Sequence, residues 1–397
     1  MKIKTIFIVR WITDVSLFLI VFYVCAVVAS FSLVRYGQWQ YNQTLKSQPD
    51  RKYLSADSLA KNIKIAELEG YERIIRPASL IYNKKLRRLA EQTNFVPLGS
   101  QPSTNVYICD EGYGLIRENL DRMGFRNNDR VWDNTNKIDI ILVGDSIVFG
   151  ECVSRSNTIA AKLLSSGANV VSLGIGANDP YHYAYIQKAY IPKVKPKFVV
   201  TVFFSNDRSI YRNTIFDKYF AIEENIDDYL FQDEFSLTLS KKASNFHAES
   251  LNHIYFEKKG IHFIEDKFRR LYTRFIYSRH WGLIGFTPYY EKFISNNSSI
   301  DPGTRYAVDT AVSLCKEHAC TPIFVYVPND DVWYKDKMAS KYRYNLEHYL
   351  NKENQKFIDT TADIKALGLD GYAPNGMHPS GLGYHVIGEA ISKVISD

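Results

Sequence analysis

A short apolar run that ends in Gly-Asp-Ser constrains this chain more than any other feature. Residues 138–143 read Ile-Asp-Ile-Ile-Leu-Val, a β-branched stretch typical of a strand buried on both faces of a parallel sheet. Gly144, Asp145 and Ser146 follow where this strand ends. Ligands of open α/β sheets bind at the carboxyl ends of the strands, so Ser146 is placed as a nucleophile would be. A strand-to-helix turn with a capping side chain is the alternative interpretation.

Strands and helices alternate over most of the chain that follows. The expected strands are 169–173, 197–204, 322–327 and 356–359, and the expected helices are 157–164, 181–191, 304–316, 337–350 and 381–396. This alternation predicts an α/β fold with a doubly wound, flavodoxin-like parallel sheet. Residues 208–300 interrupt it with a segment dense in aromatic and charged residues. Such an insertion either shapes a groove for an acceptor sugar or is the core of a subdomain.

The N-terminal region contains a membrane-spanning candidate. Ser16–Val34 is nineteen residues without a charge, which is long enough to cross a bilayer as a helix. Lys2, Lys4 and Arg10 precede it and place the N-terminus in the cytoplasm. A signal peptide cleaved near Ala29 is the alternative, but the apolar run continues beyond that residue and favours an uncleaved anchor. We therefore expect a single-pass protein of the inner (cytoplasmic) membrane whose C-terminal domain is periplasmic or extracellular.

Three regions follow from these patterns. Residues 1–34 are the cytoplasmic tail and transmembrane anchor, 35–106 a stalk or accessory region, and 107–397 the α/β domain with its insertion. The accessory region includes a helical stretch, Ser58–Ile75, and shows no residues that suggest chemistry. The start of the last region, 107–132, is turn-rich and typical of a β-hairpin.

Charge and cysteine content exclude several classes of function. The net charge of +6 is mild, and the basic clusters Lys84–Arg88 and Lys267–Arg270 are typical of solvated helix faces, so no nucleic-acid partner is expected. Cys315 and Cys320 flank four residues between a helix end and a strand start, and they could be bridged in an oxidising compartment. The cysteines and histidines show no metal-binding spacing, so no metal or other cofactor is expected.

A histidine near the C-terminus is the candidate base. His378 lies in a loop rich in glycine and proline, Pro374–Tyr384, just before the last expected helix. The topology returns this loop to the carboxyl edge of the sheet, opposite Ser146. A lone histidine is usually structural, but one in a rigid loop that faces a strand-end serine favours a catalytic role.

Four short motifs now occur in the order of a known family. They are Gly144-Asp145-Ser146, the glycine turn at 174–178, Asn206-Asp207, and His378-Pro379. From about Asn119 onward the chain resembles the SGNH (GDSL) hydrolases, and it looks closest to the membrane-anchored members associated with bacterial surface polysaccharides. The resemblance implies that Ser146 is the nucleophile and His378 the general base.

The resemblance also implies an oxyanion hole. Its donors would be the backbone N–H of Ser146, a backbone N–H at Gly176 and the side-chain amide of Asn206. Three positions depart from the family pattern. Ala177 rather than Gly176 falls at the family's glycine in the best register, and Phe204 stands where many members have glycine.

The third departure concerns the residue that orients the histidine. Asn375 stands where the family has an aspartate three residues before the histidine. Its amide oxygen can orient the imidazole of His378 but supplies no charge to stabilise an imidazolium. Asp370 is the alternative if the loop bends back.

These inferences predict an exported, membrane-anchored serine esterase or O-acyltransferase. Its substrates would be acylated carbohydrate or small esters, with acetyl groups of a cell-surface glycan foremost, and polysaccharide-assembly proteins are expected partners. One alternative is a catalytically degenerate SGNH domain that binds glycan or acts as a scaffold, with Asn375 as the sign of decay. Another is a lipid-directed esterase, supported only by the anchor.

Overall fold

A computed structural model of the chain describes residues 56–77, 88, 97–207, 241, 243–249, 300–329 and 337–396. These residues belong to one of the chain's two compact units, which runs over 52–259 and 298–397. None of the helices they form is both long and apolar enough to cross a membrane. The predicted anchor Ser16–Val34 lies outside the described residues, as do the basic cluster Lys267–Arg270 and most of the insertion at 208–300.

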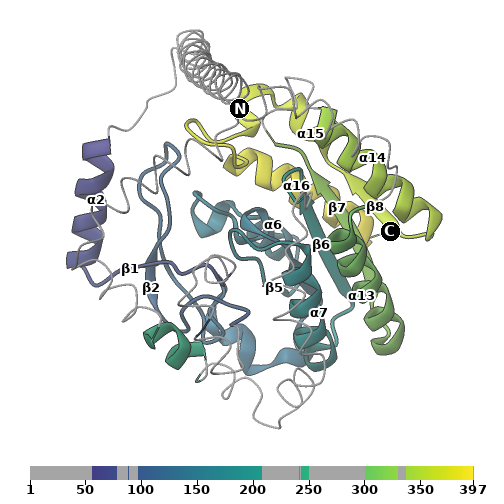
Figure 1. Ribbon diagram of the computed structural model, residues 1–397, viewed down its shortest axis with the longest axis horizontal. Helices are drawn as coiled ribbons and strands as arrows, with labels where there is room; N and C mark the ends of the chain where they lie inside the picture. The colour runs from purple at the N-terminus through teal and green to yellow at the C-terminus, as the bar shows by residue number, and fades with distance from the viewer. Residues whose placement is uncertain are drawn as a thin grey trace, which may run out of the picture. The chain divides into compact units, whose positions relative to one another are not determined.

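Parallel strands form the central sheet of the described region (Figure 1). They are β4 (Ile140–Val143), β5 (Val170–Ser172), β6 (Phe198–Phe204), β7 (Thr321–Val327) and β8 (Lys356–Asp359). Their order is β5-β4-β6-β7-β8, and every neighbouring pair is parallel. This is the flavodoxin-like order, in which the chain reverses direction across the sheet between β4 and β6. The predicted α/β fold with a parallel sheet is therefore confirmed.

Helices cover both faces of this sheet. They are α6 (Ile159–Ser165), α7 (Pro180–Val194), α13 (Pro302–His318), α14 (Lys337–Lys352), α15 (Thr361–Ala366) and α16 (Gly381–Ser396). Ile141 and Val143 of β4 pack in one apolar cluster with residues of α7, α13 and α14. Ile140 and Leu142 pack in the other cluster, with residues of α6, α15 and α16. The period-2 alternation of a strand thus supplies two cores, which is why the run is apolar on both sides.

A smaller sheet precedes the central one. It consists of β1 (Glu72–Arg73), β2 (Asn105–Tyr107) and β3 (Arg117–Asn119), with β1 parallel and β3 antiparallel to β2. The helix before it, α2, covers Ala56–Leu68 and is shorter than the predicted Ser58–Ile75. Gly70 has a φ of 84° two residues later, a left-handed conformation that cannot continue a helix, and the chain then enters β1.

Short helices and one described piece of the insertion complete the unit. The single-turn helices are α5 (Ser146–Phe149), η1 (Asp129–Asp133), η2 (Thr135–Lys137), η3 (Arg155–Asn157) and η6 (Gly368–Gly371). Within the insertion, Ala243 and Phe246 are buried in the same apolar cluster as α7 and α13. These residues therefore serve as core, and the groove predicted for the insertion lies outside the described residues.

The predicted disulfide between Cys315 and Cys320 is present. It joins the last turns of α13 to the residue before β7, and the backbone N–H of Cys320 also donates to the carbonyl of Cys315 at 3.0 Å. This bridge lies at the amino end of β7, on the edge of the sheet opposite to the carboxyl ends of the strands.

Candidate active site

Ser146 lies at the carboxyl end of β4, beside the point where the strand order reverses. It is the first residue of α5 and is 6% exposed. Asp145 caps this helix, since its Oδ1 accepts from the backbone N–H of Ile147 at 2.9 Å. The hydroxyl of Ser146 donates to Asp145 Oδ2 at 3.3 Å. A rotation about the Cα–Cβ bond would free this hydroxyl for another acceptor, because the bond to Asp145 is long.

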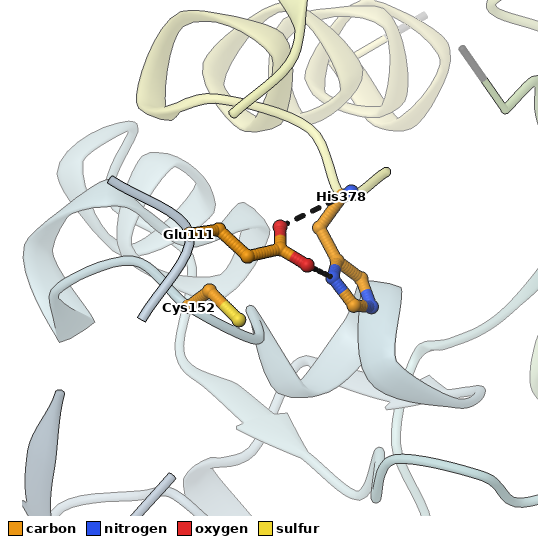
Figure 2. Close-up of side chains that lie close together, drawn as sticks. All are labelled: Glu111, Cys152 and His378. Carbon is orange, nitrogen blue, oxygen red and sulfur yellow. Dashed lines mark hydrogen bonds and ion pairs between the residues drawn. The ribbon is translucent and has the colours of Figure 1, made fainter. Parts of the chain in front are cut away.

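His378 is held by a carboxylate that the sequence analysis did not single out. Its Nδ1 lies 2.8 Å from Glu111 Oε1, and its backbone N–H donates to Glu111 Oε2 at 3.4 Å (Figure 2). An ionised carboxylate only accepts hydrogen bonds, so Nδ1 carries the proton in this pair. The neutral ring then keeps its other nitrogen, Nε2, as a free base. Glu111 thus fixes the tautomer that a general base requires.

The two residues predicted to orient His378 have other roles in the structure. Asn375 donates its backbone N–H to the carbonyl of Glu111 at 3.0 Å, so it supports the loop of the acid while Glu111 occupies Nδ1. Asp370 is exposed on η6, and its carbonyl accepts from the hydroxyl of Ser380. The prediction that Asn375 accepts from Nδ1 therefore differs from the structure.

The lack of a side chain at Gly376 leaves room for an acid from another part of the chain. A Cβ at this position would lie 1.8 Å from the carboxyl carbon of Glu111 and about as close to its two oxygens. The missing side chain leaves the space that the Glu111 carboxylate fills. The loop before α16 is therefore shaped to receive an external acid beside His378.

Glu111 lies in the loop between β2 and β3. Asp110 Oδ1 accepts from the backbone N–H groups of Gly112 at 2.9 Å and Gly114 at 3.1 Å, which closes a tight turn around Glu111. A disulfide between Cys109 and Cys152 ties this loop to the segment after α5. No pattern in the sequence predicted a partner for either of these cysteines.

The Cys152 sulfur lies beside the acid and the base in Figure 2. Cys152, Glu111 and His378 each offer one metal-ligating atom, and these atoms lie within 4.8 Å of one another. The sulfur is bonded to Cys109, however, and zinc ligation requires a thiolate. The cluster is therefore an acid–base pair beside a disulfide.

A buried arginine fixes the segment between α5 and Cys152. Arg126 donates to the carbonyls of Gly150 at 2.6 Å, Phe149 at 3.3 Å and Val153 at 2.7 Å. Its charge is balanced by an ion pair with Glu118. These bonds satisfy carbonyls at the end of a helix of one turn, where the helix itself leaves them without partners.

Two buried carboxyls lie at the same sheet edge. Asp145 follows β4, and Asp207 follows β6, where it accepts from the hydroxyl of Tyr183 at 2.9 Å and from the backbone N–H of Phe204 at 2.7 Å. Burial raises the pKa of Asp207, and the charge of Asp145 raises it further. Burial also raises the pKa of Asp145, to about 6, while the hydrogen bond from the backbone N–H of Ile147 and the electrostatic interaction with His378 lower it. This interaction places His378 near the residue that precedes the serine.

The turn after β5 carries the predicted oxyanion donor Gly176. Ala177 adopts a φ of 67°, the left-handed region that favours glycine, whereas Gly176 does not. This conformation agrees with the register that puts Ala177 at the family's glycine position. A Cβ on Gly176 would lie 2.3 Å from Glu151 Oε2, in an ion pair between Glu151 and Arg76. Gly176 thus allows that pair to pack against the turn.

Asn206 lies in the turn after β6 and is exposed between two buried neighbours, Ser205 and Asp207. Asn206 follows β6, which pairs with β4 where the strand order reverses. Ser146 and Asn206 therefore follow adjacent parallel strands. Asn178, four residues beyond Gly174, is a second amide at this edge. It is 4% exposed, and its side-chain atoms have no hydrogen-bond partner among the described residues.

Glu111 is the residue of the candidate site that the sequence did not reveal. It lies in a turn of a small separate sheet, without a periodic pattern or a motif around it. A signal was nevertheless present, because Cys109 precedes it by two residues and Cys152 follows Ser146 by six. Pairing these two cysteines would have brought the loop of Glu111 to the serine.

Comparison with known proteins gives a limited result. No family model and no curated protein matches the chain. Solved structures of similar fold include a putative lipolytic protein of the G-D-S-L family from Desulfitobacterium hafniense, with 14% identity and a TM-score of 0.34 over 66% of this chain and 99% of that one. A member of the same family from Veillonella parvula has 13% identity and a TM-score of 0.36, over 65% and 98%.

A catalytic mutant of an acetylxylan esterase from Geobacillus stearothermophilus is also similar. It has 15% identity and a TM-score of 0.34, over 66% of this chain and 97% of that one. At these identities and TM-scores the similarity carries no conclusion about activity. The chemistry of this chain has to be inferred from its own residues.

Proposed function

We propose that this protein is a serine-dependent acyl hydrolase or O-acyltransferase in which Ser146 is the nucleophile, His378 the general base and Glu111 the carboxylate that orients the base. The observation that carries the proposal is the 2.8 Å contact between Glu111 and Nδ1 of His378, in a loop that returns to the sheet edge bearing Ser146. A buried strand-end serine, a base with a fixed tautomer and an orienting acid are the parts that nucleophilic acyl transfer requires.

The reaction would begin when Ser146 turns its hydroxyl from Asp145 to Nε2 of His378. Oγ attacks the ester carbonyl as Nε2 takes its proton, and the imidazolium is stabilised by the Glu111 carboxylate. The oxyanion would be bound by the backbone N–H of Ser146, a backbone N–H in the 176–177 turn and the amide of Asn206. One such donor is commonly worth about 3 kcal/mol of transition-state stabilisation.

Collapse of this intermediate would return the proton from Nε2 to the leaving alcohol and leave an acyl group on Ser146. Attack by water, with His378 again as base, completes hydrolysis. Attack by a sugar hydroxyl completes transfer instead. The two activities therefore share one acyl-enzyme and differ only in the acceptor.

Glu111 also bears on the alternative of a degenerate, glycan-binding domain. That alternative took Asn375 as a sign that the family's carboxylate had been lost. A carboxylate is present at Nδ1, supplied by a different loop, so the departure at Asn375 no longer argues for decay.

We further propose that the acyl group is an ester on a carbohydrate, with acetyl foremost. Tyr113, on the loop of Glu111, is 46% exposed, and an aromatic face at the edge of a site can stack on a sugar ring. Its pKa is raised by partial burial and then by the charges of Glu111 and Asp370, which places it beside the acid. Met377, next to the base, is 43% exposed and adds a second apolar surface.

We propose that the α/β domain lies outside the cytoplasm and is attached to the membrane by the predicted anchor Ser16–Val34. It is supported by the apolar run and by two disulfides, which persist in oxidising compartments. A reporter that is active only outside the cytoplasm, fused after the last residue, should be active. Activity of a cytoplasmic reporter at the same position would contradict this orientation.

The activity itself is tested with the full-length chain in a mild nonionic detergent. A small acetyl ester should be hydrolysed, Ser146→Ala should abolish turnover, and Ser154→Ala, an exposed serine eight residues further on, should not. Acetylated glycan then tests the substrate class, and diacyl phospholipid tests the lipid-directed alternative. Equal turnover by the wild type and Ser146→Ala would contradict the proposal.

A further inference from the structure

We propose that the Cys109–Cys152 disulfide is a positioning device that holds Glu111 in register with His378 and Ser146, an inference that rests on the proposed function. Cys109 precedes Glu111 by two residues, and Cys152 lies six residues after Ser146. The bond therefore links the loop of the acid covalently to the segment that carries the nucleophile. The sulfur of Cys152 itself lies within 4.8 Å of the facing atoms of Glu111 and His378.

The Cys152 end of this bridge is rigid. Cys152 is 1% exposed, and its φ of 63° is left-handed, a conformation that a residue other than glycine keeps only where its surroundings impose it. Arg126 binds the carbonyls of Phe149, Gly150 and Val153, on both sides of Cys152. The hydroxyl of Ser172 in β5 also donates to the carbonyl of Val148 at 3.0 Å. The segment is thus bonded to the central sheet, and it can serve as a reference point for the loop that the disulfide joins to it.

The ion pair between Glu118 and Arg126 ties β3 to this segment, but the bonds that Glu111 itself makes do not reach it. Its backbone carbonyl accepts from Asn375, and its carboxylate binds His378, so both contacts belong to the C-terminal loop. The backbone N–H of Ile108 donates to Ile116, and that of Ile116 donates to Cys109, so these hairpin bonds fix the base of the loop to the small sheet. If the C-terminal loop shifted, Glu111 could shift with it and keep both contacts. The disulfide ties the pair to the segment of Ser146 instead.

General stabilisation is the competing explanation, since a disulfide that closes a long loop stabilises a fold through the unfolded state. The two explanations differ in how disulfide loss combines with loss of Glu111. A disulfide that only positions Glu111 affects kcat only through Glu111. Removing the disulfide should therefore not lower kcat further once Glu111 has been replaced. A general stabiliser affects activity equally in both backgrounds.

The experiment is a double-mutant cycle on the full-length chain with a small acetyl ester. Cys109→Ala/Cys152→Ala should lower kcat about 10-fold or more in a folded protein, with KM changed much less. In a Glu111→Gln background the same pair should change kcat less than about 2-fold. The matched control is Cys315→Ala/Cys320→Ala, which removes the bridge at the opposite sheet edge and should leave kcat near the wild-type value in both backgrounds.

The proposal would be overturned if loss of the disulfide and Glu111→Gln lowered kcat independently, so that the two fold-changes multiply in the combined variant. An unchanged kcat in Cys109→Ala/Cys152→Ala would also overturn it, with folding checked by circular dichroism in each case. If that variant does not fold, the bridge is opened in folded Cys315→Ala/Cys320→Ala by dithiothreitol, which becomes a cyclic disulfide as each cysteine gains one electron and one proton. A chelator is included because the freed thiolate, Glu111 and His378 would offer three ligands to a metal ion.

A readout independent of turnover separates this proposal from the proposed function. The Nδ1 proton of His378, bonded to a carboxylate, should resonate downfield of the backbone amides in ¹⁵N-histidine-labelled protein. Opening the Cys109–Cys152 bridge should remove or broaden that resonance, while the control variant keeps it. A resonance that is unchanged when the bridge opens contradicts the positioning role, whether or not any ester is cleaved. Loss of the resonance in a protein that cleaves no ester would uphold the positioning role and refute the enzymatic function.

Discussion

The carboxylate of Glu111 accepts a hydrogen bond from Nδ1 of His378 at 2.8 Å, although 267 positions separate the two residues in the chain. The contact joins the turn between β2 and β3 of the small sheet to the loop before α16, which packs on the central sheet. It fixes the proton on Nδ1 and leaves Nε2 as the base. The residues before β4 are thus part of the candidate site and not only a connection to it.

Replacing the acid tests this relationship. Glu111→Gln keeps the size of the side chain but removes the charge that stabilises an imidazolium. The equivalent change in a serine protease triad lowers kcat by about 10⁴, and we expect a loss of about 10² to 10⁴ here. Steady-state kinetics on an acetyl ester measure it. Asp370→Ala, which changes an exposed acid on η6, should alter kcat less than about 3-fold. The reverse ranking would make Asp370 the orienting acid.

Gly376→Ala tests the same contact without changing any functional group. The added methyl carbon would overlap the Glu111 carboxylate, so it should push the acid from Nδ1. We expect kcat to fall at least about 10-fold, while the midpoint of thermal unfolding changes by only a few degrees. Leu382→Ala, at an exposed position on α16, serves as the control. Unchanged turnover by Gly376→Ala would show that Glu111 does not have to lie beside His378.

The fold was predictable because its strands have an unambiguous physical signature. The run at β6, Phe198–Phe204, is apolar and β-branched because both of its faces are covered by helices, and no helix of a soluble domain needs such a pattern over so few residues. The predicted helix at 381–396 agrees with α16 at both ends. The end of α2 was missed because apolar residues occur again after β1, at Ile74 and Ile75, and the stop depends on a single glycine conformation.

The positions of the candidate site residues were predictable only where those residues follow a strand. Ser146 and Asn206 are placed by β4 and β6, so their position follows from the sheet. Glu111 is placed by a turn, a disulfide and a distant loop, and none of these leaves a local pattern. Asn375 was chosen because it is close to His378 in sequence, but proximity in a turn does not decide which side chain faces the ring.

Ala177 offers a test of the glycine turn. Because its φ is 67°, Ala177→Gly should relieve a left-handed conformation and stabilise the protein by about 0.5–1 kcal/mol. Ala319, with a φ of 57° at the end of α13, is a matched position far from the site, and Ala319→Gly should stabilise the protein similarly. Chemical denaturation measures both. A clear loss of stability in Ala177→Gly would contradict the strained turn.

Burial of the His247 ring predicts how the free energy of unfolding depends on pH. Its Nε2 donates to the carbonyl of Gly99, and burial lowers the pKa of this histidine from 6.5 to about 4. Between these two values the unfolded chain binds a proton that the folded protein does not, so the free energy of unfolding falls as the pH falls from 6.5 towards 4. The full effect is about 3 kcal/mol.

The comparison should be made between the wild type and His247→Gln in urea at several pH values. Burial raises the pKa of Asp121 to about 6, which makes that group stabilise the fold as the pH falls and partly hides the effect of the histidine in the wild type alone. The variant should lose stability less steeply on acidification. Identical slopes would show that the ring of His247 is not buried in its neutral form.

Covalent labelling of Ser146 tests the central claim most directly. The full-length protein is treated with a serine-directed organophosphonate, and the peptide that contains Ser146 is analysed by mass spectrometry. The acid, the base and the strand-end serine together predict one adduct, on Ser146, formed at a rate that Glu111→Gln lowers and His378→Ala abolishes. An unmodified Ser146 peptide, under conditions that label a control esterase completely, would contradict the assignment of this site.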